Sequence, residues 1–86
     1  MPTISVFYGI FIKMYWDDHA PPHFHAEYAG SEAVVEIASL EIIRGKLPRG
    51  AALLVREWAL QHRGELMEDW KLCEQLQTPN KIMPLE

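Results

Sequence analysis

Cysteine is almost absent from this chain, since Cys73 is the only one among 86 residues. A single cysteine excludes an internal disulfide and a metal site built from several cysteines. No apolar run approaches the roughly 18 residues that span a bilayer. The N-terminus also lacks a basic start followed by an apolar stretch and a small-residue cleavage site. Together these absences predict a cytoplasmic protein without a membrane segment.

The chain also has no excess of positive charge. Its net charge is −4, and residues 1–50 and 51–86 each carry four basic and six acidic side chains. Proteins that bind nucleic acids usually present a basic surface, because neutralising phosphates supplies much of their affinity. Nucleic acid is therefore a disfavoured partner, and a small patch of Arg44, Lys46 and Arg49 is the weaker alternative.

Several catalytic sequence patterns are missing as well. The chain contains no Gly-rich phosphate loop, no serine in a nucleophile-elbow sequence and no helical His-Glu-x-x-His pair. It has no internal repeat, linker or low-complexity segment. With 49% apolar and 23% charged residues the composition is that of a folded protein. The length predicts one domain over residues 1–86.

The first half of the chain has the period-2 pattern of β-strands. Residues 3–16 are rich in β-branched and aromatic side chains and are interrupted by Gly9. We expect Gly9 to be a bulge or bend, because one residue cannot reverse the chain. Residues 29–30 (AG) predict a tight turn. Further strand patterns lie at residues 23–28, 32–38 and, more weakly, 40–44.

The second half changes to helical periodicity. Pro48 suits the first position of a helix, where its missing N–H has no partner to lose. Gly64 marks either a kink or the join between two helices. Apolar or partly apolar side chains recur at three- or four-residue steps, at Leu54, Val55, Trp58, His62, Leu66, Trp70, Cys73 and Leu76.

These patterns predict an α+β fold. We expect a small antiparallel β-meander of three to four strands, with one long or two shorter C-terminal α-helices packed on one face. The β-rich part covers residues 1–46, the helical part 48–77 and a short tail 78–86. Ile82, Met83 and Leu85 are expected to dock that tail as an edge strand.

Titratable side chains concentrate in residues 17–25 (DDHAPPHFH), which hold three of the four histidines. The two prolines predict a stiff, extended connector between strands. His23 and His25 are two positions apart on the predicted strand, so their rings project from the same face. Glutamates of the next strand are expected to share that face.

The candidate site comprises Asp18, His19, His23, His25 and Glu27. Imidazole is the commonest ligand of transition metals in proteins. His19, His23 and His25 are therefore the predicted ligands of a divalent, Zn-like ion, with Asp18 or Glu27 completing a mixed nitrogen and oxygen site. General acid–base catalysis is an alternative, with His25 or His23 carrying the proton and Glu27 or Glu36 orienting it. A third interpretation is structural, with the rings making local hydrogen bonds or contacting a partner.

Five short segments are distinctive: MPTI at residues 1–4, FYGI at 7–10, DH at 18–19, PPHFH at 21–25 and GKLP at 45–48. They resemble the bacterial domain-of-unknown-function family 4160 over nearly the whole chain. The resemblance implies a small stand-alone prokaryotic protein of a family without an assigned activity. Its genes often accompany those of another small family, which suggests toxin–antitoxin-like or regulatory pairs. His19, His23 and His25 match the family's motif, but no catalytic role comes with them.

Two functions of different classes follow. The first is a non-enzymatic protein-binding module in a toxin–antitoxin-like or regulatory pair, whose partner is a small protein or a second copy of the chain. The acidic balance and aromatic-rich strands favour it. The alternative is a metal- or His-dependent enzyme, such as a small ribonuclease, that uses His19, His23 and His25.

Overall fold

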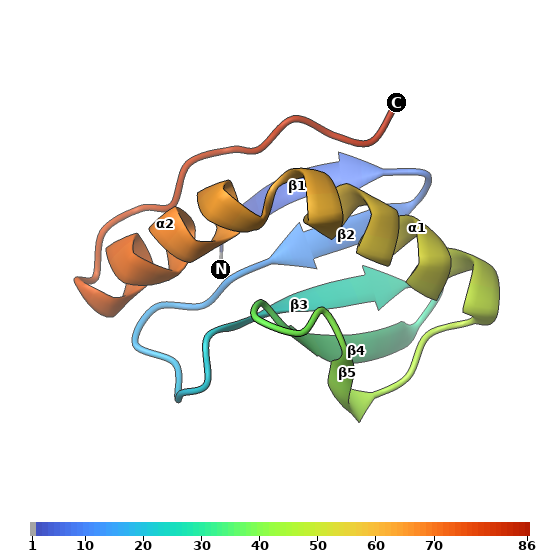
Figure 1. Ribbon diagram of the computed structural model, residues 1–86, viewed down its shortest axis with the longest axis horizontal. Helices are drawn as coiled ribbons and strands as arrows, with labels where there is room; N and C mark the ends of the chain where they lie inside the picture. The colour runs from blue at the N-terminus through green and yellow to red at the C-terminus, as the bar shows by residue number, and fades with distance from the viewer. Residues whose placement is uncertain (1) are drawn as a thin grey trace.

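The alternating apolar residues of the first half form five strands in the computed structural model, which describes residues 2–86. The strands are β1 (Thr3–Phe7), β2 (Ile10–Lys13), β3 (His23–Tyr28), β4 (Ser31–Glu36) and β5 (Ile42–Gly45). They form one antiparallel sheet in chain order (Figure 1). The predicted α+β meander is confirmed, but three to four strands was too few. Met1, which begins the MPTI segment, lies outside the described residues.

The strand count was wrong because Tyr8 and Gly9 together form a two-residue turn between β1 and β2. Their φ angles are 50° and 78°. Two positive φ angles in a two-residue loop define the type I′ hairpin turn, whose twist matches that of the strands. Tyr8 adopts this conformation although it is not glycine, so the sequence pattern indicated only a bend. The predicted turn at Ala29 and Gly30 has the same geometry, with φ of 49° and 85°.

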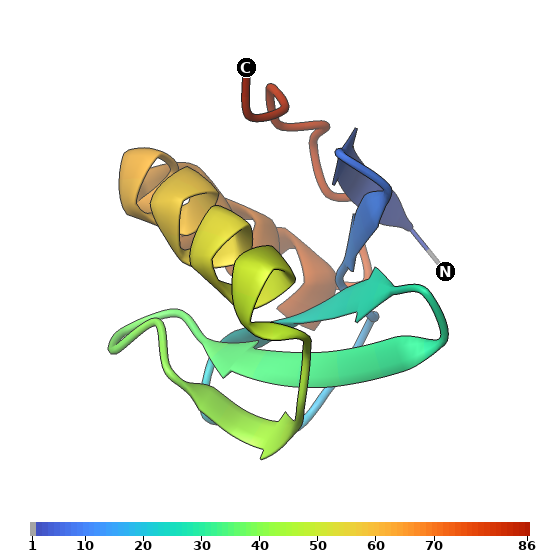
Figure 2. The same cartoon turned by 90° about the vertical axis from the view of Figure 1, so that its right-hand side faces the viewer.

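The helical periodicity produces two helices, α1 (Arg49–Gln61) and α2 (Arg63–Glu74), which cover one face of the sheet (Figure 2). Pro48 precedes α1 as its N-cap instead of being its first residue. The helices join at His62, where φ is −127°, and Gly64 lies in the first turn of α2. Within residues 2–86, no helix has the length and apolar character needed to cross a membrane.

The core lies between the helices and the sheet, with Trp58 at its centre. Trp58 is completely buried, and its ring centroid lies 5.3 Å from that of Phe7 and 5.9 Å from that of Phe24. The apolar stripe of the helices faces this core, except that Leu76 is exposed. Its other buried members are Val55, Leu66, Trp70 and Cys73.

The C-terminal tail completes the core without forming the predicted edge strand. It runs beside β1 (Figures 1 and 2), where the Ile82 N–H donates a hydrogen bond to the Ile4 carbonyl at 2.8 Å. Trp58 Nε1 donates to the Met83 carbonyl at 2.8 Å. Ile82 and Leu85 are buried, but Met83 is exposed. The tail is therefore held by side-chain burial and a few hydrogen bonds, while strand pairing is absent from residues 78–86.

Asp69 is a buried acidic residue that joins α2 to the tail. Its Oδ1 accepts a hydrogen bond from the Asn80 N–H at 2.8 Å, and its Oδ2 is buried without a partner. Burial raises the pKa of Asp69 to about 6, against about 3.9 in an unfolded chain. Between these values the folded state binds more protons, so this residue's effect is to make stability fall as the pH rises.

We expect Asp69→Asn to remove this pH dependence. The asparagine keeps the acceptor for Asn80, and above pH 6 it avoids an ionised buried carboxylate, which costs about 2 to 3 kcal/mol. The free energy of unfolding of the variant minus that of wild type should therefore be about 2 to 3 kcal/mol larger at neutral pH than at pH 4. Urea unfolding at both pH values measures the difference, with Glu74→Gln, an exposed position of the same helix, as the control. If the variant and wild type differ in free energy of unfolding by the same amount at both pH values, the prediction is wrong.

Candidate metal centre

The pairing of β3 places His25 on the face of the sheet away from the helices. His25 lies opposite Lys13 of β2 and Val34 of β4. Its neighbours in sequence, Phe24 and Ala26, are buried under the helices, as the alternation predicted. His23 begins β3, is also buried, and has its ring centroid 5.3 Å from that of His25.

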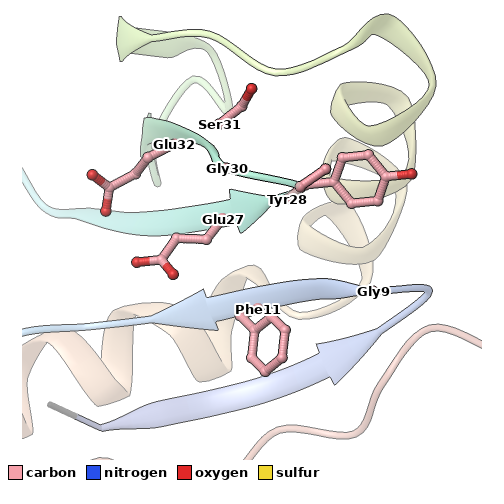
Figure 3. Close-up of a pocket in the computed structure, with 8 residues that line it drawn as sticks. Gly9, Phe11, Glu27, Tyr28, Gly30, Ser31 and Glu32 are labelled. Carbon is pink, nitrogen blue, oxygen red and sulfur yellow. The ribbon is translucent and has the colours of Figure 1, made fainter.

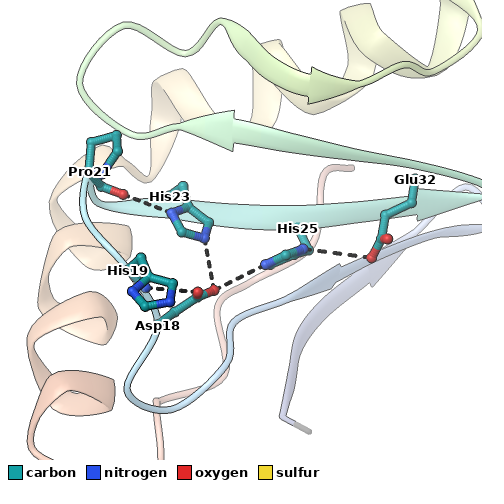
Figure 4. A network of polar contacts seen from close by, with 6 residues as sticks. All are labelled: Asp18, His19, Pro21, His23, His25 and Glu32. Carbon is teal, nitrogen blue, oxygen red and sulfur yellow. Dashed lines mark hydrogen bonds and ion pairs between the residues drawn. The ribbon is translucent and has the colours of Figure 1, made fainter.

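The loop between β2 and β3 returns Asp18 to these two rings. The Asp17 N–H donates to the Cys73 carbonyl at 3.2 Å, which ties the loop to the C-terminal end of α2. Asp18 Oδ2 then lies 2.8 Å from His23 Nε2 and 3.3 Å from His25 Nε2 (Figure 4). The three possible ligand atoms lie within 4.8 Å of one another. Asp18, His23 and His25 are close in sequence, and the path of the loop brings their ligand atoms together.

The far nitrogen of each ring faces an oxygen acceptor. His23 Nδ1 lies 2.7 Å from the Pro21 carbonyl, which can only accept, so Nδ1 carries the hydrogen. His25 Nδ1 is buried and lies 3.6 Å from Glu32 Oε2, beyond hydrogen-bond distance (Figure 4). A hydrogen on Nδ1 directed at a carbonyl or carboxylate is the usual support of a metal-binding histidine. In His23 this arrangement leaves Nε2 to face Asp18, and the Nε2 of His25 faces the same carboxylate.

Asp18 is the negative centre of the cluster. Burial alone would raise its pKa, but the hydrogen bond from the His19 N–H and the contacts with the His25 and His23 rings lower the pKa of Asp18 below its usual value. The carboxylate is therefore ionised at neutral pH. Two imidazole nitrogens and one ionised carboxylate that face one another are ligand groups that suit a metal cation.

Tyr15 forms a wall of the cluster. Its ring packs edge-on against that of His25, with centroids 4.3 Å apart. Burial, and then the charges of Glu32 and Glu27, raise the pKa of the Tyr15 phenol. Tyr15 is therefore neutral near pH 7 and limits access to His25 from one side.

The other predicted site residues lie outside the converging group. His19 lines the same cavity, of about 120 Å³, but only its backbone N–H contacts Asp18. Glu27 forms an ion pair with Lys13 at 3.0 Å. Glu32, on the next strand, lies beside His25, whereas the sequence predicted Glu27 or Glu36 as the glutamate that orients a histidine. Arg44 of β5 also lines the cavity, and sequence reasoning did not connect it with the histidines.

A larger hollow, of about 390 Å³, lies between the Tyr8–Gly9 and Ala29–Gly30 turns (Figure 3). Phe11, Glu27 and Glu32 are among its lining residues. Glu27 faces Lys13, and Glu32 faces His25. Within residues 2–86, this hollow contains no group of three possible metal ligands. The Asp18–His23–His25 cluster is therefore the stronger candidate for a site.

Comparison with known proteins gives one match. The family described as "Domain of unknown function (DUF4160)" matches residues 9–71. This range covers most of the chain, including the complete Asp18–His23–His25 cluster. No curated protein and no solved structure matches the chain. The resemblance inferred from the sequence segments is thereby confirmed.

Proposed function

The chain belongs to the DUF4160 family, and we propose that its Asp18–His23–His25 cluster binds one divalent transition-metal ion of the Zn²⁺ type. The observation that carries this proposal is the convergence of two imidazole Nε2 atoms and one carboxylate oxygen within 4.8 Å. The hydrogen bond between His23 Nδ1 and the Pro21 carbonyl, which fixes that ring, favours it over a chance grouping.

Two of the three distances between ligand atoms are close to those of such a site. With metal–ligand bonds of about 2.0–2.2 Å, neighbouring ligand atoms of a tetrahedral site lie about 3.3–3.6 Å apart. The Asp18 and His25 atoms already lie 3.3 Å apart, and the 2.8 Å between Asp18 and His23 has to widen by about half an ångström. Two nitrogens and one oxygen are ligands that zinc and its neighbours accept.

Three protein ligands favour a catalytic site over a purely structural one. Structural zinc sites are usually closed by four protein ligands, whereas catalytic sites keep one position for water or substrate. An ion with such a position supplies Lewis-acid chemistry and an activated water near neutral pH. His19, on the wall of the same cavity, is placed to act as a proton carrier. The geometry therefore favours the metal-dependent enzyme over the binding module.

The test is the metal content and metal affinity of untagged protein. Elemental analysis after purification, followed by calorimetric titration of the metal-free protein with Zn²⁺, should give one ion per chain. The competing explanation is a latch in which hydrogen bonds from the histidines merely hold the loop on β3. Protein that neither retains nor binds Zn²⁺, Co²⁺ or Mn²⁺ would establish the latch.

The exposed strand β5 supports a second candidate, the predicted binding of a small protein or a second copy. β5 ends the sheet, so one of its backbone edges has no strand partner within residues 2–86. Ile42 and Ile43 on it are 39% and 47% exposed. Unpaired edges with apolar side chains are common sites of strand addition by a partner. A toxin–antitoxin-like partner and the cytoplasmic location remain proposals of the same kind.

We expect Ile42→Lys to prevent this association, because a charged side chain on an edge strand opposes pairing. Light scattering after size-exclusion chromatography measures self-association, and co-expression with the product of the adjacent gene measures partner binding. Leu53→Lys, on the exposed side of α1, is the control. A wild-type protein that stays monomeric and binds no partner would end this second candidate.

A further inference from the structure

One residue of the cavity has no role in the proposed metal site: Arg44. Lys13, His25, Val34 and Arg44 are successive partners across β2, β3, β4 and β5. Directly opposed residues have their Cα atoms about 4.5–5.5 Å apart, so Arg44 lies about 10 Å from His25 along this row. Residues opposed in this way share one face of a sheet. Val34 and Arg44 therefore lie on the same face of the sheet as His25, and all three line the same cavity.

The two cations that flank His25 along this row differ in their partners. Lys13 pairs with Glu27 at 3.0 Å. Arg44 is exposed, and the ion pairs of residues 2–86 include no carboxylate within 4.0 Å of it. Arg44 is thus a cation at the cavity whose charge no neighbouring acid neutralises.

The charges around the cavity then favour an anion. A divalent ion held by one carboxylate and two neutral imidazoles has a net charge of +1, and Arg44 adds another positive charge. Glu32 is the nearest further carboxylate, and it lies against His25 on the far side of that ring (Figure 4). The cavity, of about 120 Å³, has room for one small oxyanion.

We propose that this cavity binds the phosphate group of a small phosphate ester, with one oxygen on the metal ion and others on the Arg44 guanidinium. The planar fork of arginine presents two parallel N–H groups that match two phosphate oxygens. The inference rests on the proposed function, because the metal ion supplies the other half of the anion's contacts. A nucleic-acid backbone is disfavoured, since the chain is acidic in both halves.

The experiment uses the full chain loaded with Co²⁺, whose visible absorption reports ligands at the open position. Inorganic phosphate, phenyl phosphate and acetate are titrated separately into wild type, Arg44→Ala, Arg44→Gln and Lys46→Ala. Lys46 is a neighbouring cation outside the cavity lining, so it is the matched control. We expect saturable phosphate binding that weakens about tenfold or more in both Arg44 variants and stays unchanged in Lys46→Ala. Co²⁺ affinity should be the same in all four proteins.

The two stages separate the possible failures. Wild type that binds no Co²⁺ would overturn the proposed function and, with it, this inference. Co²⁺ binding with equal phosphate affinity in wild type and Arg44→Ala would overturn the inference alone. Tighter binding of phenyl phosphate than of inorganic phosphate supports an ester as the ligand, whereas tighter binding of acetate than of either phosphate would contradict the phosphate assignment.

Discussion

The His23→Ala/His25→Ala double variant is expected to lose Zn²⁺ affinity by more than about 100-fold. Substitutions that only disturb the support of a metal ligand already cost about 10- to 100-fold, and this variant removes two ligands outright. Asp18 remains, but a single carboxylate on a loop does not hold a transition metal selectively. Competition with a chromophoric chelator measures the affinity, and circular dichroism checks that the variant folds.

His19→Ala is the matched control for this prediction. It removes a histidine from the same cavity wall, but the His19 ring is outside the converging ligand atoms. Its Zn²⁺ affinity should change by less than about threefold, which is below the smallest loss expected for disturbing a ligand's support. The loss of Zn²⁺ affinity in Glu32→Gln should lie between those of His19→Ala and the double variant. This substitution keeps an oxygen acceptor beside His25 Nδ1 but removes its negative charge.

Two results would contradict the assignment. Zn²⁺ binding of the double variant at wild-type affinity would place any metal site elsewhere in the chain. A loss in His19→Ala equal to that of the double variant would show that the ligands are the three predicted histidines and not the cluster with Asp18. If the double variant fails to fold, Asp18→Asn keeps the size of the side chain and tests the same site.

Gly45→Ala is expected to give a large loss of stability, of about 3 kcal/mol or more. Gly45 ends β5 with φ of +73°, and a Cβ there would lie 2.2 Å from the Glu32 carbonyl oxygen. That carbonyl accepts a hydrogen bond from the Lys46 N–H at 3.2 Å. The backbone of β4 or β5 must therefore move, which disturbs the strand that carries Arg44. Chemical unfolding measures the loss.

Gly30→Ala separates the clash from the backbone conformation. Gly30 has φ of +85°, yet a Cβ there would meet nothing within 4 Å. This control should cost only about 1 to 2 kcal/mol, the usual penalty for a side chain in the left-handed region. The difference in stability loss between Gly45→Ala and Gly30→Ala measures the cost of the steric clash between β5 and β4. Equal losses in the two variants would contradict the prediction.

Much of the fold follows from local patterns. The alternation of apolar residues predicted the strands around His23–Tyr28 and Ser31–Glu36, because side-chain direction in a strand depends only on parity. The helical stripe and the turn at Ala29–Gly30 are also short-range features. The strand count failed at Tyr8, since a bulky residue with positive φ has no strong local signature.

The candidate site was likewise predicted only in part from the sequence. The sequence by itself determined that His23 and His25 share a face and that a proline-rich connector precedes them. Only the tertiary structure decided that Asp18, and not His19 or Glu27, meets both rings, and that Arg44 lies on the same row. The return of the loop depends on its bond to α2, and the position of Arg44 depends on the register of three strand pairs. Periodicity states which way a side chain points, but not which strand or loop lies beside it.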